Sequence, residues 1–269
     1  MRISFDDNIH SQKYNYKTLY NKQRKGLNFS AHPDYYTIIA QGYDITTSNW
    51  FRRGLSYGKP SESFRDVIYC LKRVFEFAPS AAEPKKMLIG GIGESQEPLS
   101  LLAVVKNIIK EKPLTQKLDL YTVDLQSRPT LEELYEQSFV DDVAPAYVKD
   151  SFVIDAKTSK YRVKDEIFEY LAKVYNDTSK SLWDTRIQEA VKDYPNETFD
   201  VASVNNTLGY IKDWDERVYT AENIVRAIKK GGYFITDTAD PGNGSLRPII
   251  RNLMLEIDLG IFKKMPWSK

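Results

Sequence analysis

The spacing of apolar residues changes repeatedly along the chain, and this alternation limits the fold more than any other feature. Compact apolar runs, typical of buried strands, occur at 87–90, 118–124, 199–205 and 233–237. Apolar residues recur at the three- and four-residue spacing of a helix in the segments 97–111, 130–138, 217–230 and 246–258. Strands that alternate with helices predict an α/β fold with a doubly wound, mostly parallel sheet.

The interval 139–185 interrupts this alternation. Residues 151–154 and 160–163 alternate apolar and polar side chains on either side of a polar turn, which predicts an inserted β-hairpin. A helical pattern at 165–175 follows the predicted hairpin.

Two further segments and a glycine pair also indicate secondary structure. Residues 61–77 also have helical spacing, and 259–263 form a short final apolar run. Gly231-Gly232 follows the helical segment 217–230, and we expect this pair to end the helix.

Composition narrows the class of protein. Lys and Arg number 38 against 37 Asp and Glu, a net charge of +1, so no overall field attracts nucleic acid or an anionic membrane. The single cysteine, Cys70, excludes an internal disulfide, and with only two histidines the chain is a poor source of zinc ligands. Cys70 lies in an apolar helical stretch, which favours a packing role. No apolar run approaches the ~20 residues of a membrane span, and the start MRISFDDNIHSQ lacks the features of a signal peptide, so we expect a cytoplasmic protein.

A glycine turn joins the first predicted strand to the helix after it, in the stretch MLIGGIGESQEPLS at 87–100. Glycine has no Cβ, so a backbone with Gly91 and Gly93 can approach a nucleotide-like ligand closely. The stretch lacks the third glycine of the dinucleotide fingerprint, and no GK[ST] follows it. A tight turn that binds no ligand therefore stays an alternative.

Polar residues follow two other predicted strands. Asp124 ends the strand 118–124, where a carboxylate can accept hydrogen bonds from both hydroxyls of a ribose, and Asn205-Asn206 ends the strand 199–205. Taken alone, Asp124 could instead lie at a helix N-terminus, and the asparagine pair could form a simple turn. Ligands of open parallel sheets bind beyond the carboxyl ends of the strands. The three strand ends together favour a nucleoside ligand without a pyrophosphate, and S-adenosylmethionine fits that description.

Several segments match one known series of motifs. Residues 45–52 (ITTSNWFR) resemble TNxTxFFR, 91–100 (GIGESQEPLS) resemble GCSTGEEPYS, and 122–125 (TVDL) resemble ATDID. Residues 199–211 resemble FDxIxCRNVxIYF, with the later turn KKGG at 229–232 in the place of KPGG. The chain thus resembles the class I S-adenosylmethionine-dependent methyltransferases over roughly 44–240. Within that fold it is most similar to the CheR type, the protein-glutamate O-methyltransferases of bacterial chemotaxis.

The resemblance implies a Rossmann-like fold with a small inserted β-hairpin, and a cytoplasmic bacterial enzyme that uses S-adenosylmethionine. It divides the chain into a partly helical N-terminal arm, 1–44, and a methyltransferase domain, 45–269, with the hairpin at about 145–165. It places Arg52 and Tyr210 next to the methyl acceptor. The cofactor-binding residues that it implies are Thr46, Ser48, Arg52, Gly91, Gly93, Glu97, Asp124, Gln188, Asn205 and Asn206. It implies no metal.

The chain departs from these motifs at several positions. Thr46 replaces the asparagine of TNxT, Gln96 replaces a glutamate of TGEE, and Asn205 replaces the arginine of CRN. About 45 residues precede the first motif, where the family usually carries a longer helical domain that docks on chemoreceptors. Two alternatives to a carboxylate acceptor therefore stay open: a small-molecule or other acceptor, and a degenerate relative that binds the cofactor or a partner without catalysis. The sequence specifies neither the acceptor nor the oligomeric state.

Overall fold

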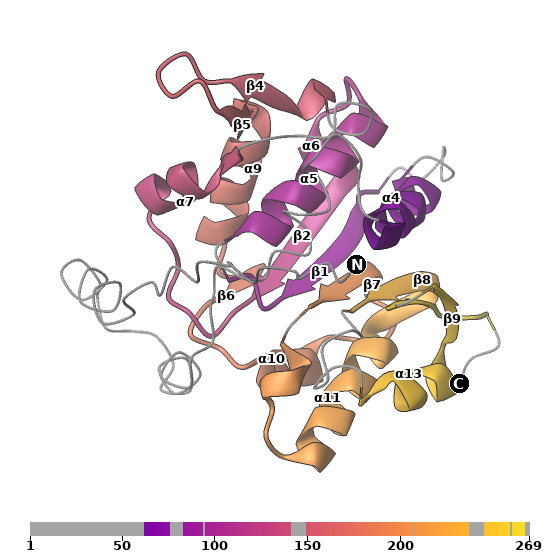
Figure 1. The fold of residues 1–269 in the computed structure, drawn as a ribbon. Helices are drawn as coiled ribbons and strands as arrows, with labels where there is room; N and C mark the ends of the chain where they lie inside the picture. The colour runs from indigo at the N-terminus through magenta and orange to yellow at the C-terminus, as the bar shows by residue number, and fades with distance from the viewer. Residues whose placement is uncertain are drawn as a thin grey trace, which may run out of the picture. The chain divides into compact units, whose positions relative to one another are not determined.

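The computed structural model describes residues 62–75, 83–93, 95–140, 149–205, 207–236, 245–258 and 260–266. All of them belong to one compact unit of the chain. Within them the chain forms a seven-stranded sheet, a three-stranded sheet, and helices on both faces of the larger sheet (Figure 1). No helix among these residues is long and apolar enough to cross a bilayer.

The larger sheet has the strand order β6-β2-β1-β7-β8-β10-β9. Its strands are β1 (Lys85–Gly90), β2 (Leu118–Val123), β6 (Ser181–Leu182), β7 (Phe199–Val204), β8 (Ile228–Ile235), β9 (Leu255–Asp258) and β10 (Ile261–Lys263). The five strands from β6 to β8 are parallel, and β10 is antiparallel to both of its neighbours. The chain moves outward from β1 to β6 and then returns to the other side of β1, so the order reverses between β1 and β7. This topology confirms the predicted doubly wound, mostly parallel sheet.

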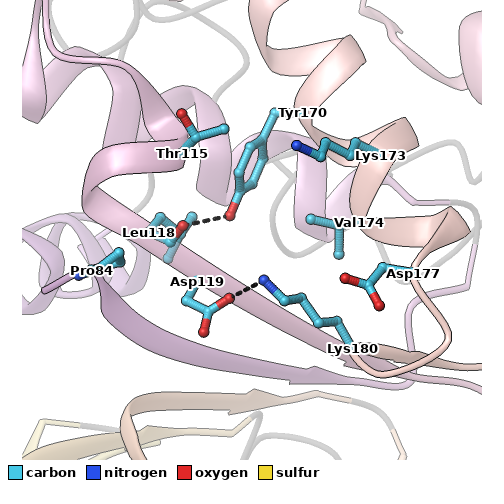
Figure 2. A pocket seen from close by; sticks show the side chains of 9 residues that line it. All are labelled: Pro84, Thr115, Leu118, Asp119, Tyr170, Lys173, Val174, Asp177 and Lys180. Carbon is cyan, nitrogen blue, oxygen red and sulfur yellow. Dashed lines mark hydrogen bonds and ion pairs between the residues drawn. The ribbon is translucent and has the colours of Figure 1, made fainter.

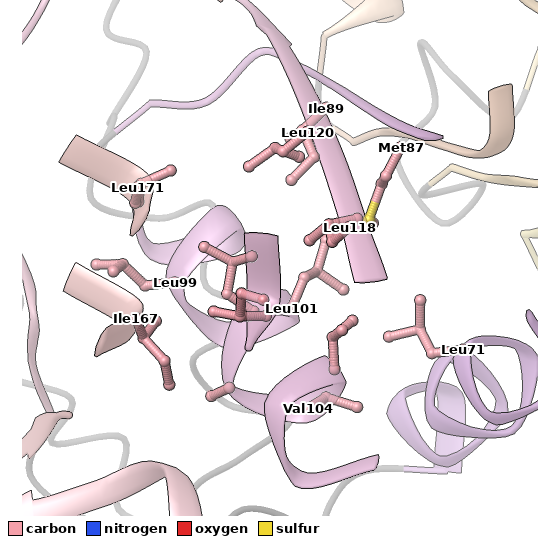
Figure 3. Close-up of a cluster of buried hydrophobic side chains, with 14 of the residues drawn as sticks. Leu71, Met87, Ile89, Leu99, Leu101, Val104, Leu118, Leu120, Ile167 and Leu171 are labelled. Atoms are coloured by element: carbon pink, nitrogen blue, oxygen red, sulfur yellow. The ribbon is translucent and has the colours of Figure 1, made fainter. Parts of the chain in front are cut away.

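Two layers of helices cover this sheet. One layer packs α4 (Glu62–Phe75), α5 (Gln96–Ile109) and α9 (Asp165–Asn176) into a single apolar cluster (Figure 3). The other packs α10 (Ile187–Asp193), α11 (Trp214–Ala227) and α13 (Arg247–Leu253). The other helices are α6 (Leu114–Lys117), α7 (Leu131–Gln137), η2 (Lys149–Ser151) and η3 (Leu208–Tyr210).

Burial on both faces explains the composition of the central strands. On β1, Met87 and Ile89 belong to the first cluster, whereas Leu88 belongs to the second. Successive side chains of a strand point to opposite faces, so a strand covered on both sides needs apolar residues at consecutive positions. Cys70 is buried in the first cluster, which confirms its packing role.

The predicted hairpin is also present, within a small sheet of the order β3-β5-β4. β4 (Phe152–Ile154) and β5 (Tyr161–Val163) pair antiparallel around a turn in which Asp155 accepts hydrogen bonds from the N–H groups of Lys157 and Thr158. A third strand, β3 (Phe139–Val140), pairs with the other edge of β5 and was not predicted. The boundary between an arm and a domain at residue 44 lies outside the described residues and stays a prediction.

The prediction that Gly231-Gly232 ends the helix 217–230 is wrong. The helix α11 begins at Trp214, after the N-cap Asp213, and ends at Ala227, and both glycines lie inside β8. They occupy an irregularity in the pairing of β7 with β8, where Gly231 has a φ of 83°. A Cβ on Gly232 would stand 2.8 Å from the Asp200 carbonyl oxygen. The glycines therefore permit a bulge and a close approach of two strands.

The predicted helix 246–258 is also wrong in its second half. The helix α13 ends at Leu253, and Leu255–Asp258 forms the edge strand β9. Leu255 and Ile257 are exposed and alternate with Glu256, which is a spacing of two residues and not of three or four. The sequence reading also missed α6, β6 and α10, which are too short to show a clear period.

Candidate functional site

The strands β1, β2 and β7 end side by side. Gly90 is in register with Val123 on one side and with Val204 on the other. The residues that follow these three positions are Gly91, Asp124 and Asn205. The sheet therefore brings together the three strand ends that the sequence predicted to share a ligand, at the edge where its strand order reverses.

Gly91 is required by the packing of the protein itself. Its φ is 74°, in the left-handed region, and its N–H donates to the Val123 carbonyl oxygen at 2.9 Å. A Cβ at this position would stand 1.8 Å from Oγ1 of Thr207, in the loop after β7. Any side chain would thus push the turns after β1 and β7 apart.

Asp124 presents a buried carboxylate to this edge, with 8% of its surface exposed. Its Oδ1 accepts from the backbone N–H of Gln126 at 2.7 Å, and its Oδ2 accepts from the N–H of Gly93 at 3.1 Å. Burial raises the pKa of Asp124 to about 6, although backbone hydrogen bonds oppose this shift. A carboxylate has about four acceptor positions, so positions remain for two hydroxyls of a ligand. The next helix, α7, begins at Leu131, so Asp124 is not a helix N-terminal residue.

A buried polar cluster connects the first turn of α5 to the end of β7. Oε1 of Glu97 accepts from Ser203 Oγ at 2.6 Å and from Asn205 Nδ2 at 2.9 Å. All three side chains are at least nine-tenths buried. Among the described residues, Oδ1 of Asn205 is buried and has no hydrogen-bond partner. Buried polar atoms normally have a partner, so this oxygen is an acceptor that a ligand's donor could satisfy.

The other predicted residues divide into two groups. Gln188 is buried on α10, where its neighbour Ile187 packs against Gly90 at the end of β1. Tyr210 lies on η3, five residues after Asn205, and is 39% exposed. Outside the described residues lie Thr46, Ser48, Arg52 and Asn206.

Sequence reasoning missed three residues that shape this site. Ser203 is a polar residue inside the otherwise apolar second half of β7, and this break in the pattern could have indicated it. Gln126 and Thr207 gave no comparable signal, because their roles depend on loops that are distant in sequence.

A hollow of about 300 Å³ lies elsewhere, where β2 begins (Figure 2). Tyr170 donates to the Leu118 carbonyl oxygen at 2.8 Å in this hollow, and Lys180 pairs with Asp119 at 2.6 Å. No predicted site residue lines it. Ligands of open parallel sheets bind at the carboxyl ends of the strands, whereas this hollow lies at the opposite end of β2. The candidate site is therefore the edge formed by Gly91, Asp124 and Asn205. Among the described residues, no cluster of His, Cys, Asp and Glu is arranged to hold a metal ion.

Comparison with known proteins adds a likeness of fold. No protein-family model and no curated protein matches the chain. One similar solved structure is NodS, an N-methyltransferase from Bradyrhizobium japonicum WM9 in complex with S-adenosyl-L-homocysteine, with 14% identity, a TM-score of 0.37, and coverage of 82% of this chain and 99% of that chain. A second is CrArsM, an arsenic(III) S-adenosylmethionine methyltransferase from Chlamydomonas reinhardtii, with 15% identity, a TM-score of 0.31, and coverage of 66% of this chain and 48% of that chain. A third is a phosphoethanolamine N-methyltransferase from Haemonchus contortus, with 16% identity, a TM-score of 0.30, and coverage of 71% of this chain and 32% of that chain. The chain spans less than half the length of the last two. With TM-scores below 0.5, these likenesses carry no argument about activity. What the strand order itself shows is a doubly wound, mostly parallel α/β sheet.

Proposed function

We propose that this protein is an S-adenosylmethionine-dependent methyltransferase. The observation that carries the proposal is the meeting of a glycine turn, a buried carboxylate and an unpartnered amide oxygen at the switch point of the sheet. These groups suit a ligand that has ribose hydroxyls at one end and an ammonium group at the other. The site contains no phosphate-binding motif, which argues for a nucleoside over a dinucleotide.

Each residue has a definite task in this proposal. Asp124 accepts hydrogen bonds from the two ribose hydroxyls. Glu97 binds Nδ2 of Asn205 and thereby fixes which end of the amide is available, so that Oδ1 accepts from the ammonium group of the methionine part. Gln188 lies near the adenine. When bound, S-adenosylmethionine supplies an electrophilic methyl group on a sulfonium.

For the acceptor we propose a carboxylate of a protein glutamate, as in the CheR type. A carboxylate is already nucleophilic at neutral pH, so transfer requires positioning and exclusion of water, and no general base. Arg52 would orient the carboxylate through its fork of donors, and the Tyr210 hydroxyl would hold one acceptor oxygen. The support for this part is the motif resemblance together with the place of η3 directly after the loop of β7. A cytoplasmic location in a bacterium rests on the same resemblance.

Calorimetry with S-adenosylmethionine and S-adenosylhomocysteine tests cofactor binding. Asp124→Ala removes a charged acceptor of two hydrogen bonds, and we expect its affinity for either ligand to fall by roughly 100-fold. Asp119→Ala is the matched control, because Asp119 lies at the opposite end of the same strand and pairs with Lys180 instead. If the wild-type protein binds neither ligand, the proposed function is refuted. Equal affinities of the two variants would refute the role of Asp124.

A labelling experiment tests the acceptor. Candidate protein and small-molecule acceptors are incubated with a radioactive methyl donor and then treated with mild alkali. A carboxyl methyl ester releases volatile labelled methanol, whereas a methyl group on nitrogen or carbon is retained. Retention of the label would refute the glutamate acceptor and favour an acceptor of another class.

A further inference from the structure

The turn after β1 is held on both sides by the loop after β2. The N–H of Gly93 donates to Oδ2 of Asp124 at 3.1 Å. The carbonyl oxygen of Gly93 accepts from the side-chain amide Nε2 of Gln126. Both polar backbone groups of Gly93 are therefore bonded to side chains that lie two residues apart in the same loop.

Gln126 also connects this loop to a third one. Its backbone N–H donates to Oδ1 of Asp124 at 2.7 Å, and its carbonyl oxygen accepts from the N–H of Asp184 at 3.1 Å. Asp184 belongs to the loop after β6, where the N–H of Thr185 donates to the Asp124 carbonyl oxygen at 3.0 Å. The loops that follow β1, β2 and β6 thus meet at one residue.

We propose that Gln126 is a positioning residue that orients the Asp124 carboxylate and the Gly93 turn before the cofactor arrives. The inference rests on the proposed function, in which Asp124 holds the ribose. Gln126 holds one carboxylate oxygen through its own N–H and secures the donor of the other through Gly93. The acceptor positions left for a ligand are then fixed in direction, and this removes an ordering cost from binding.

A purely structural role would make a different prediction. Gln126 would then stabilise the loops without altering what Asp124 does, and its loss would lower stability alone. The pKa of Asp124 separates the two roles, because burial and backbone hydrogen bonds, including that of Gly93, are its main influences. A change at Gln126 that loosens Gly93 removes a hydrogen bond to the ionised form, so it raises the pKa of Asp124 further.

The test uses three variants of the full chain. Gln126→Met keeps the length of the side chain but removes its donor, whereas Gln126→Glu also adds a negative charge beside Asp124. Gln116→Met, at an exposed position of α6, is the matched control. We expect both Gln126 variants, but not the control, to bind S-adenosylhomocysteine roughly tenfold more weakly than the wild type. We also expect the ¹³C carboxyl resonance of Asp124 in the ligand-free protein to titrate at higher pH, with Gln126→Glu shifted most.

The outcomes are distinct. If the pKa of Asp124 is the same in all variants, the inference is overturned whether or not the protein binds the cofactor. Weaker binding that only follows a lower melting temperature, with no change in the titration, overturns it as well. If the titration shifts as expected but the wild-type protein does not bind S-adenosylhomocysteine, the proposed function fails while the positioning of Asp124 by Gln126 stands.

Discussion

At the scale of single residues, Asp124 combines two properties that oppose each other. Its carboxylate lies in a buried environment that disfavours the charge, and the neighbouring backbone N–H groups only partly compensate. In the proposed function, this charge costs stability in the free protein and is used to bind the ligand.

The pH dependence of stability should reveal this cost. The pKa of Asp124 is about 6 in the folded protein and near 3.8 in the unfolded chain, so its contribution is most favourable at low pH and is lost as the pH rises through about 6. Relative to Asp124→Asn, the wild-type protein should lose about 1 kcal/mol of unfolding free energy between pH 5 and pH 7. Urea unfolding of both proteins at the two pH values measures it. A constant difference would contradict a raised pKa.

Ser95 combines an unusual backbone conformation with a buried side-chain hydrogen bond. It is fully buried before α5 and has a φ of 58°, in the left-handed region that serine rarely adopts. Its Oγ accepts from the hydroxyl of Tyr175, whose pKa is strongly raised by burial, at 3.0 Å. We expect Ser95→Ala to lower the unfolding free energy by about 1–2 kcal/mol, because the Tyr175 hydroxyl then loses its partner. In a Tyr175→Phe background the same substitution should change the unfolding free energy little. An equal loss in both backgrounds would show that the hydrogen bond with Tyr175 is not its cause.

At the scale of elements, the end of α11 shows why a glycine signal misled the prediction. A helix leaves its last carbonyl groups unsatisfied, and glycine after the last turn is the common solution. Here other groups supply the donors. The N–H groups of Ile228 and Glu197 bond to the carbonyl oxygens of Val225 and Arg226. The ammonium group of Lys264, beyond β10, adds a further donor. Its Nζ lies 3.0 Å from the Val225 carbonyl oxygen, 3.4 Å from that of Arg226 and 2.8 Å from that of Ile228. The chain can therefore enter β8 directly after Ala227.

Removal of this ammonium group should destabilise the fold. Lys264 is 4% exposed and burial lowers its pKa. Lys264→Met removes a buried donor that serves three carbonyl groups, two of which keep a backbone N–H donor. We expect a loss of about 2 kcal/mol in unfolding free energy. The control is Lys263→Met, since Nζ of Lys263 lies over the Tyr233 ring at 5.8 Å and should contribute less than about 1 kcal/mol. Equal thermal stability of the two variants would show that the contacts of Lys264 do not matter.

At the scale of the whole molecule, the fold was predictable because its signals are local and repeated. A strand that is covered on both faces, such as β1, needs apolar residues at consecutive positions. Such a run can be recognised in the sequence alone. The two-residue strand β6 was not predictable, because its place beside β2 depends on pairing between segments about 60 residues apart. The same holds for β9, whose exposed apolar residues are ambiguous between a helix end and an edge strand.

The sequence by itself determined the class of the fold and the three strand ends at which polar residues follow apolar runs. Only the tertiary structure decided how those ends meet: that Gly91 makes room for Thr207, that Glu97 reaches across to Asn205, and that Gln126 joins three loops. The physical reason is the range of the interactions. Periodicity and turn propensity act between neighbours along the chain, whereas these contacts join residues 33 to more than 100 positions apart and exist only once the sheet has set its register.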